Sequence, residues 1–321
     1  MNKYIFSFLL LLPTYIKAQT TQPTINDIFK ASFKAIKLPK EPDFLAADGE
    51  TAWVIDNGNN RIQKISVNGK KPQIIDTING ACAAPVIAFN AVWVVNCKEK
   101  KIYKIDKVTG RILAKIYTGV ADDNGEMSLA AGDGSIWALT DSSGTLSRIN
   151  PAANIVVSVI TVKPGSYCAA FGYGFVWVTN YTDNSIQKID PKTNTVTATI
   201  PVGLKPRFLS VGEHGVWTLN QGDGTVTRIE PGTNNVVATI DVAAKGGGGD
   251  ITAGGGRVWI VSTNINRPLQ TINPATNVID NIYLQTADKG KKIKVDGAAR
   301  ASGKYVWVSN LYSQTVWAFK R

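Results

Sequence analysis

Seven tryptophans recur at the same position of an internal repeat. Each follows an alanine, a valine or an isoleucine, and neighbouring copies lie 40 to 48 residues apart. The seven are Trp53, Trp93, Trp137, Trp177, Trp217, Trp259 and Trp307. A repeat of about 40 to 50 residues is typical of one four-stranded blade of a β-propeller. The 321-residue chain is therefore predicted to form a seven-bladed ring rather than two separately packed domains.

One copy of the repeat shows the expected strands. Residues 176–180 (VWVTN) and 185–190 (SIQKID) are short and rich in β-branched side chains, and so are 195–203 (TVTATIPVG) and 208–212 (FLSVG). Between the middle two lies the turn Asp190–Asn194, in which proline presets φ and the final asparagine can adopt the left-handed conformation. No segment shows a sustained 3.6-residue period. The predicted class is all-β, with four antiparallel strands per blade.

The two ends of the chain complement each other. Residues 33–43 align without a gap on residues 197–207, so they contain an outer strand that precedes the first complete repeat. The last repeat stops after its third strand, at Arg321. We therefore predict that an N-terminal strand closes the last blade, with residues 19–30 as a linker and residues 31–321 as the propeller.

Residues 1–18 have the features of a secretory signal peptide. Lys3 precedes an apolar run from Tyr4 to Leu12, and Ala18 fits the cleavage site. The run is shorter than the ~20 residues that a membrane-spanning helix needs. We expect a periplasmic or secreted protein without a transmembrane segment.

Composition excludes several classes of protein. A single histidine and three cysteines argue against zinc-finger arrays, haem and iron–sulfur proteins. The formal net charge of +11 would suit anionic partners, but a charge spread over a chain of this length also simply favours solubility. Nucleic acid is therefore a partner that the sequence allows but does not favour, and we expect a monomer.

The cysteines fall at informative positions. Cys82 precedes the innermost strand of the second blade and Cys97 follows the next strand, so the two face each other in an antiparallel hairpin. In an exported protein we expect them to form a disulfide, whose loop would contribute about 3 kcal/mol. Cys168 is then an odd thiol, and without a histidine nearby in the repeat a structural role is favoured over a nucleophilic one.

Propeller geometry narrows the search for a binding site. The loop that enters each innermost strand shares a face with the turn between the second and third strands, and both open onto the central channel. Polar residues at these positions differ between blades, which favours adaptation to an asymmetric ligand, although solvated loop ends would look similar. The candidates are Asp43, Glu126, Tyr167, Arg207, Asp250, Asp296, Asn180 and Asn220. The asparagines also fit a purely structural role, and oxygen ligands of this kind would suit Ca²⁺ or Mg²⁺.

Two flexible connections lie on the same predicted face. The longer one, residues 286–297, carries four lysines: Lys289, Lys291, Lys292 and Lys294. Such a basic loop could attract an anionic ligand, or it could be an ordinary solvated loop. Gly246–Gly249 precedes no helix, so the pattern does not support a phosphate cradle.

The run VWVTN with the following SIQKIDPKTNTVTATIPVG resembles the YVTN-type β-propeller repeat, with tryptophan in place of the tyrosine. The resemblance covers nearly the whole chain after the signal peptide. It implies the fold but says little about activity, because such propellers serve as binding platforms, surface proteins and occasionally enzymes.

Repeat length and the tryptophan-bearing strand also resemble the virginiamycin B lyase family. In that family, histidines that follow a proline before an inner strand act with glutamate and magnesium in a ring-opening elimination. The matching positions here are Asp43 after Pro42 and Arg207 after Pro206, and neither can replace a neutral histidine base. The only histidine, His214, falls in a turn on the opposite face.

We therefore predict a non-enzymatic binding platform that takes a small ligand or a protein at its channel face. The alternative is a metal-dependent lactonase or a streptogramin-lyase-like enzyme. Lactonase-type propellers bind calcium through glutamate, asparagine and aspartate at the channel, which Glu126, Asn180, Asn220 and Asp250 could imitate.

Overall fold

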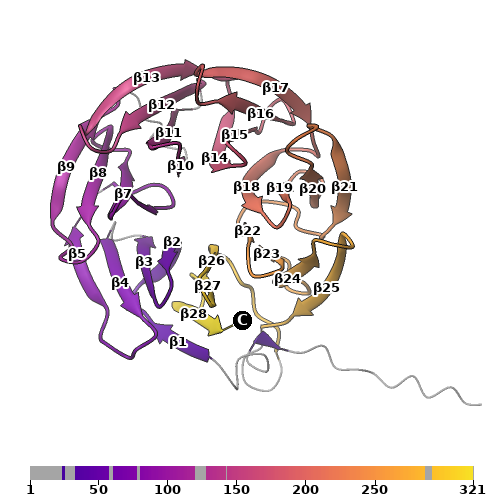
Figure 1. Ribbon diagram of the computed structural model, residues 1–321. Coiled ribbons are helices and arrows are strands. Elements are labelled where there is room, and N and C mark those ends of the chain that lie inside the picture. The colour runs from indigo at the N-terminus through magenta and orange to yellow at the C-terminus, as the bar shows by residue number, and fades with distance from the viewer. Residues whose placement is uncertain are drawn as a thin grey trace, which may run out of the picture.

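The computed structural model describes residues 24–25, 33–57, 61–77, 80–119, 128–141, 143–285 and 291–320. Within these residues, 28 strands form seven four-stranded antiparallel sheets that surround a central channel (Figure 1). The predicted all-β, seven-bladed propeller is confirmed. Each sheet is one blade, and its strands follow one another in sequence from the channel outward, except in the last blade.

The first four blades each consist of four consecutive strands, from the channel outward. Blade 1 contains β2 (Glu41–Asp48), β3 (Thr51–Asn57), β4 (Arg61–Ser66) and β5 (Gln73–Thr77). Blade 2 contains β6 (Val86–Ala88), β7 (Ala91–Asn96), β8 (Lys101–Asp106) and β9 (Ile112–Tyr117). Blade 3 contains β10 (Ser128–Gly132), β11 (Ser135–Asp141), β12 (Thr145–Asn150) and β13 (Ile155–Thr161). Blade 4 contains β14 (Ser166–Gly172), β15 (Phe175–Asn180), β16 (Ser185–Asp190) and β17 (Thr195–Pro201).

The remaining strands complete the ring. Blade 5 contains β18 (Pro206–Gly212), β19 (Gly215–Asn220), β20 (Thr225–Ile229) and β21 (Val236–Asp241). Blade 6 contains β22 (Asp250–Ala253), β23 (Val258–Val261), β24 (Leu269–Asn273) and β25 (Val278–Tyr283). Blade 7 contains β26 (Ala299–Ser302), β27 (Tyr305–Asn310), β28 (Thr315–Lys320) and, as its outer strand, β1 (Phe33–Lys37).

The repeated tryptophans are core residues. Each lies on the second strand of its blade, and the most exposed of the seven, Trp259, is only 7% exposed. In five consecutive blades the indole N–H also donates to a carbonyl oxygen five residues earlier; Trp177 bonds Gly172 in this way at 3.1 Å. The tryptophan therefore fills the space between sheets and holds the hairpin of the first two strands.

A basic side chain beside the tryptophan links neighbouring blades. Lys188 is the cross-strand partner of Trp177, and its ammonium lies 5.1 Å from the indole centroid. The ammonium donates to the carbonyl oxygen of Pro231 at 2.8 Å and to Oδ1 of Asn234 at 3.0 Å, both in the turn of the next blade. Asn234 has a φ of 64°, the left-handed conformation predicted for this turn.

This link, which we call the cation strap, joins five successive pairs of blades in the described part of the chain. Its residues are Lys64, Lys104, Arg148, Lys188 and Arg228. At the same position blades 6 and 7 have Thr271 and Ala318, as the cross-strand partners of Trp259 and Trp307. Blade 7 is therefore joined to its two neighbours by other contacts.

The N-terminal strand closes the last blade, as predicted. β1 pairs antiparallel with β28, with Ala35 opposite Trp317. Blade 7 then contacts blade 1 through the indole N–H of Trp307, which donates to the carbonyl oxygen of Gly49 at 3.1 Å. The ring is thus completed by hydrogen bonds between the two ends of the chain.

The segment expected to be a linker makes one further contact. Ile25 is fully buried, and its N–H donates to the carbonyl oxygen of Leu284 at 2.7 Å, just beyond β25. Its side chain belongs to the hydrophobic cluster that contains Trp259 and Phe319, whose rings lie 5.0 Å apart. Ile25 therefore fills the junction between blades 6 and 7. The predicted signal peptide, residues 1–18, lies outside the described residues.

Candidate functional site

The innermost strands of the seven blades enclose a central cavity of about 340 Å³. Most of the side chains that line it are apolar, and they include the rings of Phe44, Tyr167, Phe171 and Phe208. Pockets that bind small molecules are commonly of this size and combine apolar walls with a few convergent polar groups. The polar groups here include two predicted mouth residues, Tyr167 and Asp250, and Arg300, which the sequence did not single out.

Two of the predicted mouth residues contact each other. Nε of Arg207, on β18, donates to the hydroxyl of Tyr167, on β14, at 2.6 Å. The guanidinium lies 4.8 Å from the Tyr167 ring centroid and 5.4 Å from that of Phe208, within cation–π range of both. The Tyr167 and Phe208 rings meet edge to face at 5.9 Å. Both rings line the cavity, so the guanidinium is held over its wall.

Two further residues extend this group outward. The ring of Tyr181 lies 6.1 Å from that of Tyr167, and the ammonium of Lys205 lies 5.7 Å from the Tyr181 ring. We call Tyr167, Tyr181, Lys205, Arg207 and Phe208 the mouth cluster. Tyr181 directly follows Asn180 and Lys205 lies two residues before Arg207, so reading one or two positions beyond the predicted ones would have found both.

Asp296 lies across the glycine loop from Arg207. Its Oδ1 accepts a 2.8 Å hydrogen bond from the N–H of Gly249. Gly248 has a φ of 89°, and a Cβ there would lie 2.6 Å from Oδ1 of Asp296, so the close approach requires glycine. Burial raises the pKa of the Asp296 carboxyl, although two backbone N–H groups, Arg207 and Lys294 oppose this.

Asp250 and Arg300 form an ion pair in the cavity wall. The Asp250 carboxylate is buried, and it accepts hydrogen bonds from Arg300, from the N–H of Ile251 at 2.8 Å and from the N–H of Ala299 at 3.2 Å. Burial raises the pKa of Asp250 despite the guanidinium. Sequence reasoning missed Arg300 because it lies three residues beyond the position read in each repeat.

Cys168 also lines the cavity. Its sulfur lies 3.6 Å from the hydroxyl of Ser128, on the neighbouring inner strand. Burial raises the pKa of the thiol, so it is protonated at neutral pH and is a poor nucleophile.

The two predicted asparagines are buried within the blades. Nδ2 of Asn180 donates to the carbonyl oxygen of Pro164 at 2.7 Å, and its Oδ1 accepts from the N–H of Asp183 at 2.7 Å. The Asn220 amide bonds three hydroxyls of its own blade, those of Thr218, Thr225 and Thr227. These contacts hold each amide within its own blade.

The remaining predicted residues are dispersed. Asp43 lies near the start of β2, where its carbonyl oxygen accepts from the Ser309 hydroxyl of blade 7 at 2.5 Å. Glu126 and Lys289 lie outside the described residues. Lys291, Lys292 and Lys294 are exposed, and Lys292 donates to Oδ1 of Asn266 at 2.9 Å.

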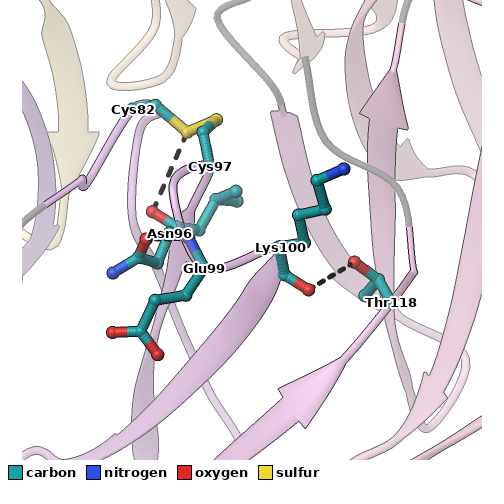
Figure 2. The surroundings of a disulfide bond; sticks show 7 residues. Cys82, Asn96, Cys97, Glu99, Lys100 and Thr118 are labelled. Carbon is teal, nitrogen blue, oxygen red and sulfur yellow. Dashed lines mark hydrogen bonds between the residues drawn. A yellow bond between two sulfur atoms is a disulfide. The ribbon is translucent and has the colours of Figure 1, made fainter. Parts of the chain in front are cut away.

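Cys82 and Cys97 form a disulfide in blade 2 (Figure 2). It joins the segment before β6 to the loop after β7, next to a hydrogen bond from the Cys97 N–H to the carbonyl oxygen of Gly80 at 2.9 Å. β6 has only three residues, and Ala84 and Pro85, just before it, line the cavity. The disulfide thus anchors the segment before β6, which forms part of the cavity wall next to a short strand with few hydrogen bonds.

Histidine, cysteine, aspartate and glutamate side chains form no group of three that could hold a metal ion within the described residues. His214 is exposed, in the turn between β18 and β19 at the far end of β18 from Arg207. No helix in the described part of the chain has the length and apolar character of a membrane span.

Comparisons with known proteins support the fold. Virginiamycin B lyase from Staphylococcus aureus superimposes with a TM-score of 0.74 at 14% identity, covering 90% of this chain and 99% of that chain. A catalytically inactive variant of that enzyme, with quinupristin, gives 0.74 at 16% identity, covering 90% and 99%. A chain of a mitotic checkpoint complex gives 0.75 at 10% identity, covering 100% and 99%.

These likenesses place the chain among the seven-bladed propellers. At such low identities they show the fold alone, which a lyase and a chain of a mitotic checkpoint complex share. No protein-family model matches the chain, and no curated protein matches its sequence.

Proposed function

We propose that the protein is a monomeric, exported, non-enzymatic propeller that binds a small ligand in its channel cavity. The observation that carries this proposal is the mouth cluster, in which a guanidinium is held against two aromatic rings of the cavity wall. Elsewhere in the ring, a basic side chain lies over the tryptophan of its own blade and donates a hydrogen bond to the next blade, which stabilises the fold. In the mouth cluster the basic side chain of Arg207 instead lies over Tyr167 and Phe208, whose rings line the cavity.

The polar groups of the cavity suit binding better than chemistry. The Asp250 carboxylate is committed to Arg300 and to two backbone N–H groups. Burial raises the pKa of the Cys168 thiol, which keeps the thiol protonated. A general base or a nucleophile would need to be free to exchange a proton with a ligand.

Export is supported by the N-terminal sequence and by the disulfide. Lys3 followed by the apolar run from Tyr4 to Leu12 fits a signal peptide, and structural disulfides persist in oxidising compartments. We propose that the protein acts in the periplasm or outside the cell.

A screen of small molecules by saturation-transfer NMR tests the binding proposal. Ala170 lines the cavity, whereas Ala152 is exposed in the turn between β12 and β13. Ligands of the wild type should lose binding to the folded Ala170→Leu variant and keep it for Ala152→Leu, without being chemically changed. Absence of any ligand, or ligands that both variants bind equally, would refute the proposal.

The alternative is a metal-dependent lactonase or lyase, which the fold shared with virginiamycin B lyase favours. Elemental analysis of protein purified without chelator separates the two. The binding proposal expects less than stoichiometric divalent metal and no effect of chelator on ligand affinity. A stoichiometric ion whose removal abolishes turnover of a lactone would establish the enzyme instead.

A further inference from the structure

One position of the inner strands divides the cavity wall into an apolar half and a polar half. In blades 2 to 7 the residue at this position is the cross-strand partner of the repeated tryptophan. All six of these residues line the cavity, and in blade order they are Val86, Ala130, Ala170, Ser210, Thr252 and Arg300. Blades 2 to 4 therefore supply apolar side chains at this level, and blades 5 to 7 supply polar ones. This division indicates which class of ligand the cavity takes, an inference that rests on the proposed function.

The two hydroxyls of the polar half each have a proton to donate. Oγ of Ser210 accepts a hydrogen bond from the N–H of Ala253 at 2.9 Å, and Oγ1 of Thr252 accepts one from the N–H of Ala301 at 3.3 Å. These are the hydrogen bonds that the described residues give the two hydroxyls, and in both the oxygen is the acceptor. Because a hydroxyl is also a donor, each can give its proton to a group in the cavity.

Arg300 adds further donors without adding net charge. Its guanidinium binds the Asp250 carboxylate and the carbonyl oxygen of Ala299, and both bonds use Nη1. A guanidinium has five N–H donors, three of which are on Nε and the other Nη. Among the described residues that line the cavity, Asp250 and Arg300 are the charged ones, so their charges balance. The polar half thus offers hydrogen-bond donors but no net charge.

We propose that the cavity takes a small neutral compound that combines an apolar ring with a carbonyl group. The ring packs against the apolar half, and the carbonyl oxygen accepts hydrogen bonds from the polar half. A carbonyl oxygen has two lone pairs and no proton, so it complements a wall of donors. An ion fits less well, because the charges of the wall are already paired with each other and leave the cost of its desolvation uncompensated.

Three one-ring probes test this class: the ketone acetophenone, its alkene counterpart α-methylstyrene and the anion benzoate. Their affinities are measured by NMR titration. Acetophenone should bind at least about tenfold more tightly than benzoate, because burying an uncompensated charge is costly. Benzoate that binds as tightly as acetophenone, or more tightly, would overturn the neutral class.

Matched serine variants test the hydrogen bond. The alkene has the shape of the ketone but leaves water more readily, so the decisive quantity is the ratio of the two affinities in each variant. Ser210→Ala should shift this ratio against acetophenone by about two- to tenfold, the range for one hydrogen bond, and Thr252→Val should shift it in the same direction. The matched control is Ser128→Ala, which also removes a hydroxyl that lines the cavity.

The Ser128 hydroxyl differs from the other two in where its proton goes. Its Oγ accepts from the N–H of Ala169 at 3.0 Å and has the carbonyl oxygen of the same residue as an acceptor at 3.3 Å. Ser128→Ala should therefore change the affinities for ketone and alkene alike. A ratio that neither Ser210→Ala nor Thr252→Val changes, or that Ser128→Ala changes as much, would contradict the proposal.

Infrared spectroscopy gives a readout that needs no variant. The carbonyl stretch of bound acetophenone, isolated as the difference between ¹³C- and ¹²C-carbonyl samples, should lie nearer to its value in water than to its value in cyclohexane, because hydrogen bonds weaken the C=O bond. A stretch at the cyclohexane value would overturn the ligand class but not the cavity site. If no probe binds while the screen finds other cavity ligands, the ligand class again fails alone; if nothing binds, the proposed function fails with it.

Discussion

The ammonium group of Lys188 lies over the indole of Trp177 and donates a hydrogen bond to the carbonyl oxygen of Pro231, in the next blade. One side chain therefore caps a core residue of its own sheet and holds a turn of the neighbouring sheet. Because the same strap recurs from blade 1 to blade 6, its loss at one place should weaken the ring as a whole.

Replacing the strap lysine tests this coupling. Lys188→Met keeps the aliphatic stem but removes the ammonium, leaving the Pro231 carbonyl without its donor. We expect a loss of about 1–3 kcal/mol in the free energy of unfolding, the range for a hydrogen bond to a charged group plus a cation–π contact. Urea denaturation measures it, and Lys192→Met, at an exposed turn position, should change stability by less than about 0.5 kcal/mol. Equal stability of the two variants would contradict the strap.

The N-terminal contact of Ile25 should also stabilise the ring. Ile25→Ala removes a fully buried side chain between blades 6 and 7, and such truncations cost about 2–5 kcal/mol. Thermal and urea unfolding check the prediction, with Val236→Ala on an exposed face of β21 as the control. An unaffected midpoint would mean that this segment does not stabilise the ring.

The disulfide predicts a stability difference and a defined thiol count. Cys82→Ser with Cys97→Ser should destabilise the protein by about 3 kcal/mol, as expected for a loop of roughly 15 residues. Under denaturing, non-reducing conditions the wild type should alkylate at Cys168 alone, which intact mass shows as a single addition. Three additions would show that the bond does not form.

Asp296 predicts how stability depends on pH. Because burial raises its pKa in the folded state, the folded protein holds this proton more strongly than the unfolded chain does. The protonated Asp296 carboxyl therefore makes its full contribution to the free energy of unfolding below the unfolded pKa of about 3.9. This contribution is lost as the pH rises through the raised pKa of the folded state. The difference in the free energy of unfolding, Asp296→Asn minus wild type, should therefore become more positive as the pH rises from 4 to 7. Urea titrations at the two pH values measure this, and a constant or opposite difference would contradict it.

The sequence predicted the fold because each blade has its own copy of the repeat, which can be recognised within about 45 consecutive residues. A tryptophan every 40 to 48 residues marks the blades, and the alignment of residues 33–43 with 197–207 marks the closing strand. Tyr167 and Arg207 were found in the same way, since repeat position alone brings them to one mouth.

What the sequence did not reveal depends on partners in other blades. Lys188 and Pro231 are 43 residues apart, and no local pattern tells a strap lysine from a solvated one. The pairing of Arg300 with Asp250 and the burial of Ile25 likewise depend on how the sheets pack. The position of a residue in the repeat predicts its strand within a blade. It does not predict which side chains of neighbouring blades contact each other.

The seventh sheet has a consequence for biosynthesis. Three of its strands come from the last residues of the chain and the fourth from the first ones, and the Trp307 bond to Gly49 spans nearly the whole length. During synthesis or export β1 emerges early, whereas β26, β27 and β28 emerge last. The ring can therefore close only after β26–β28 have been synthesised, and a product that terminates before β26 would lack three strands of the closing sheet.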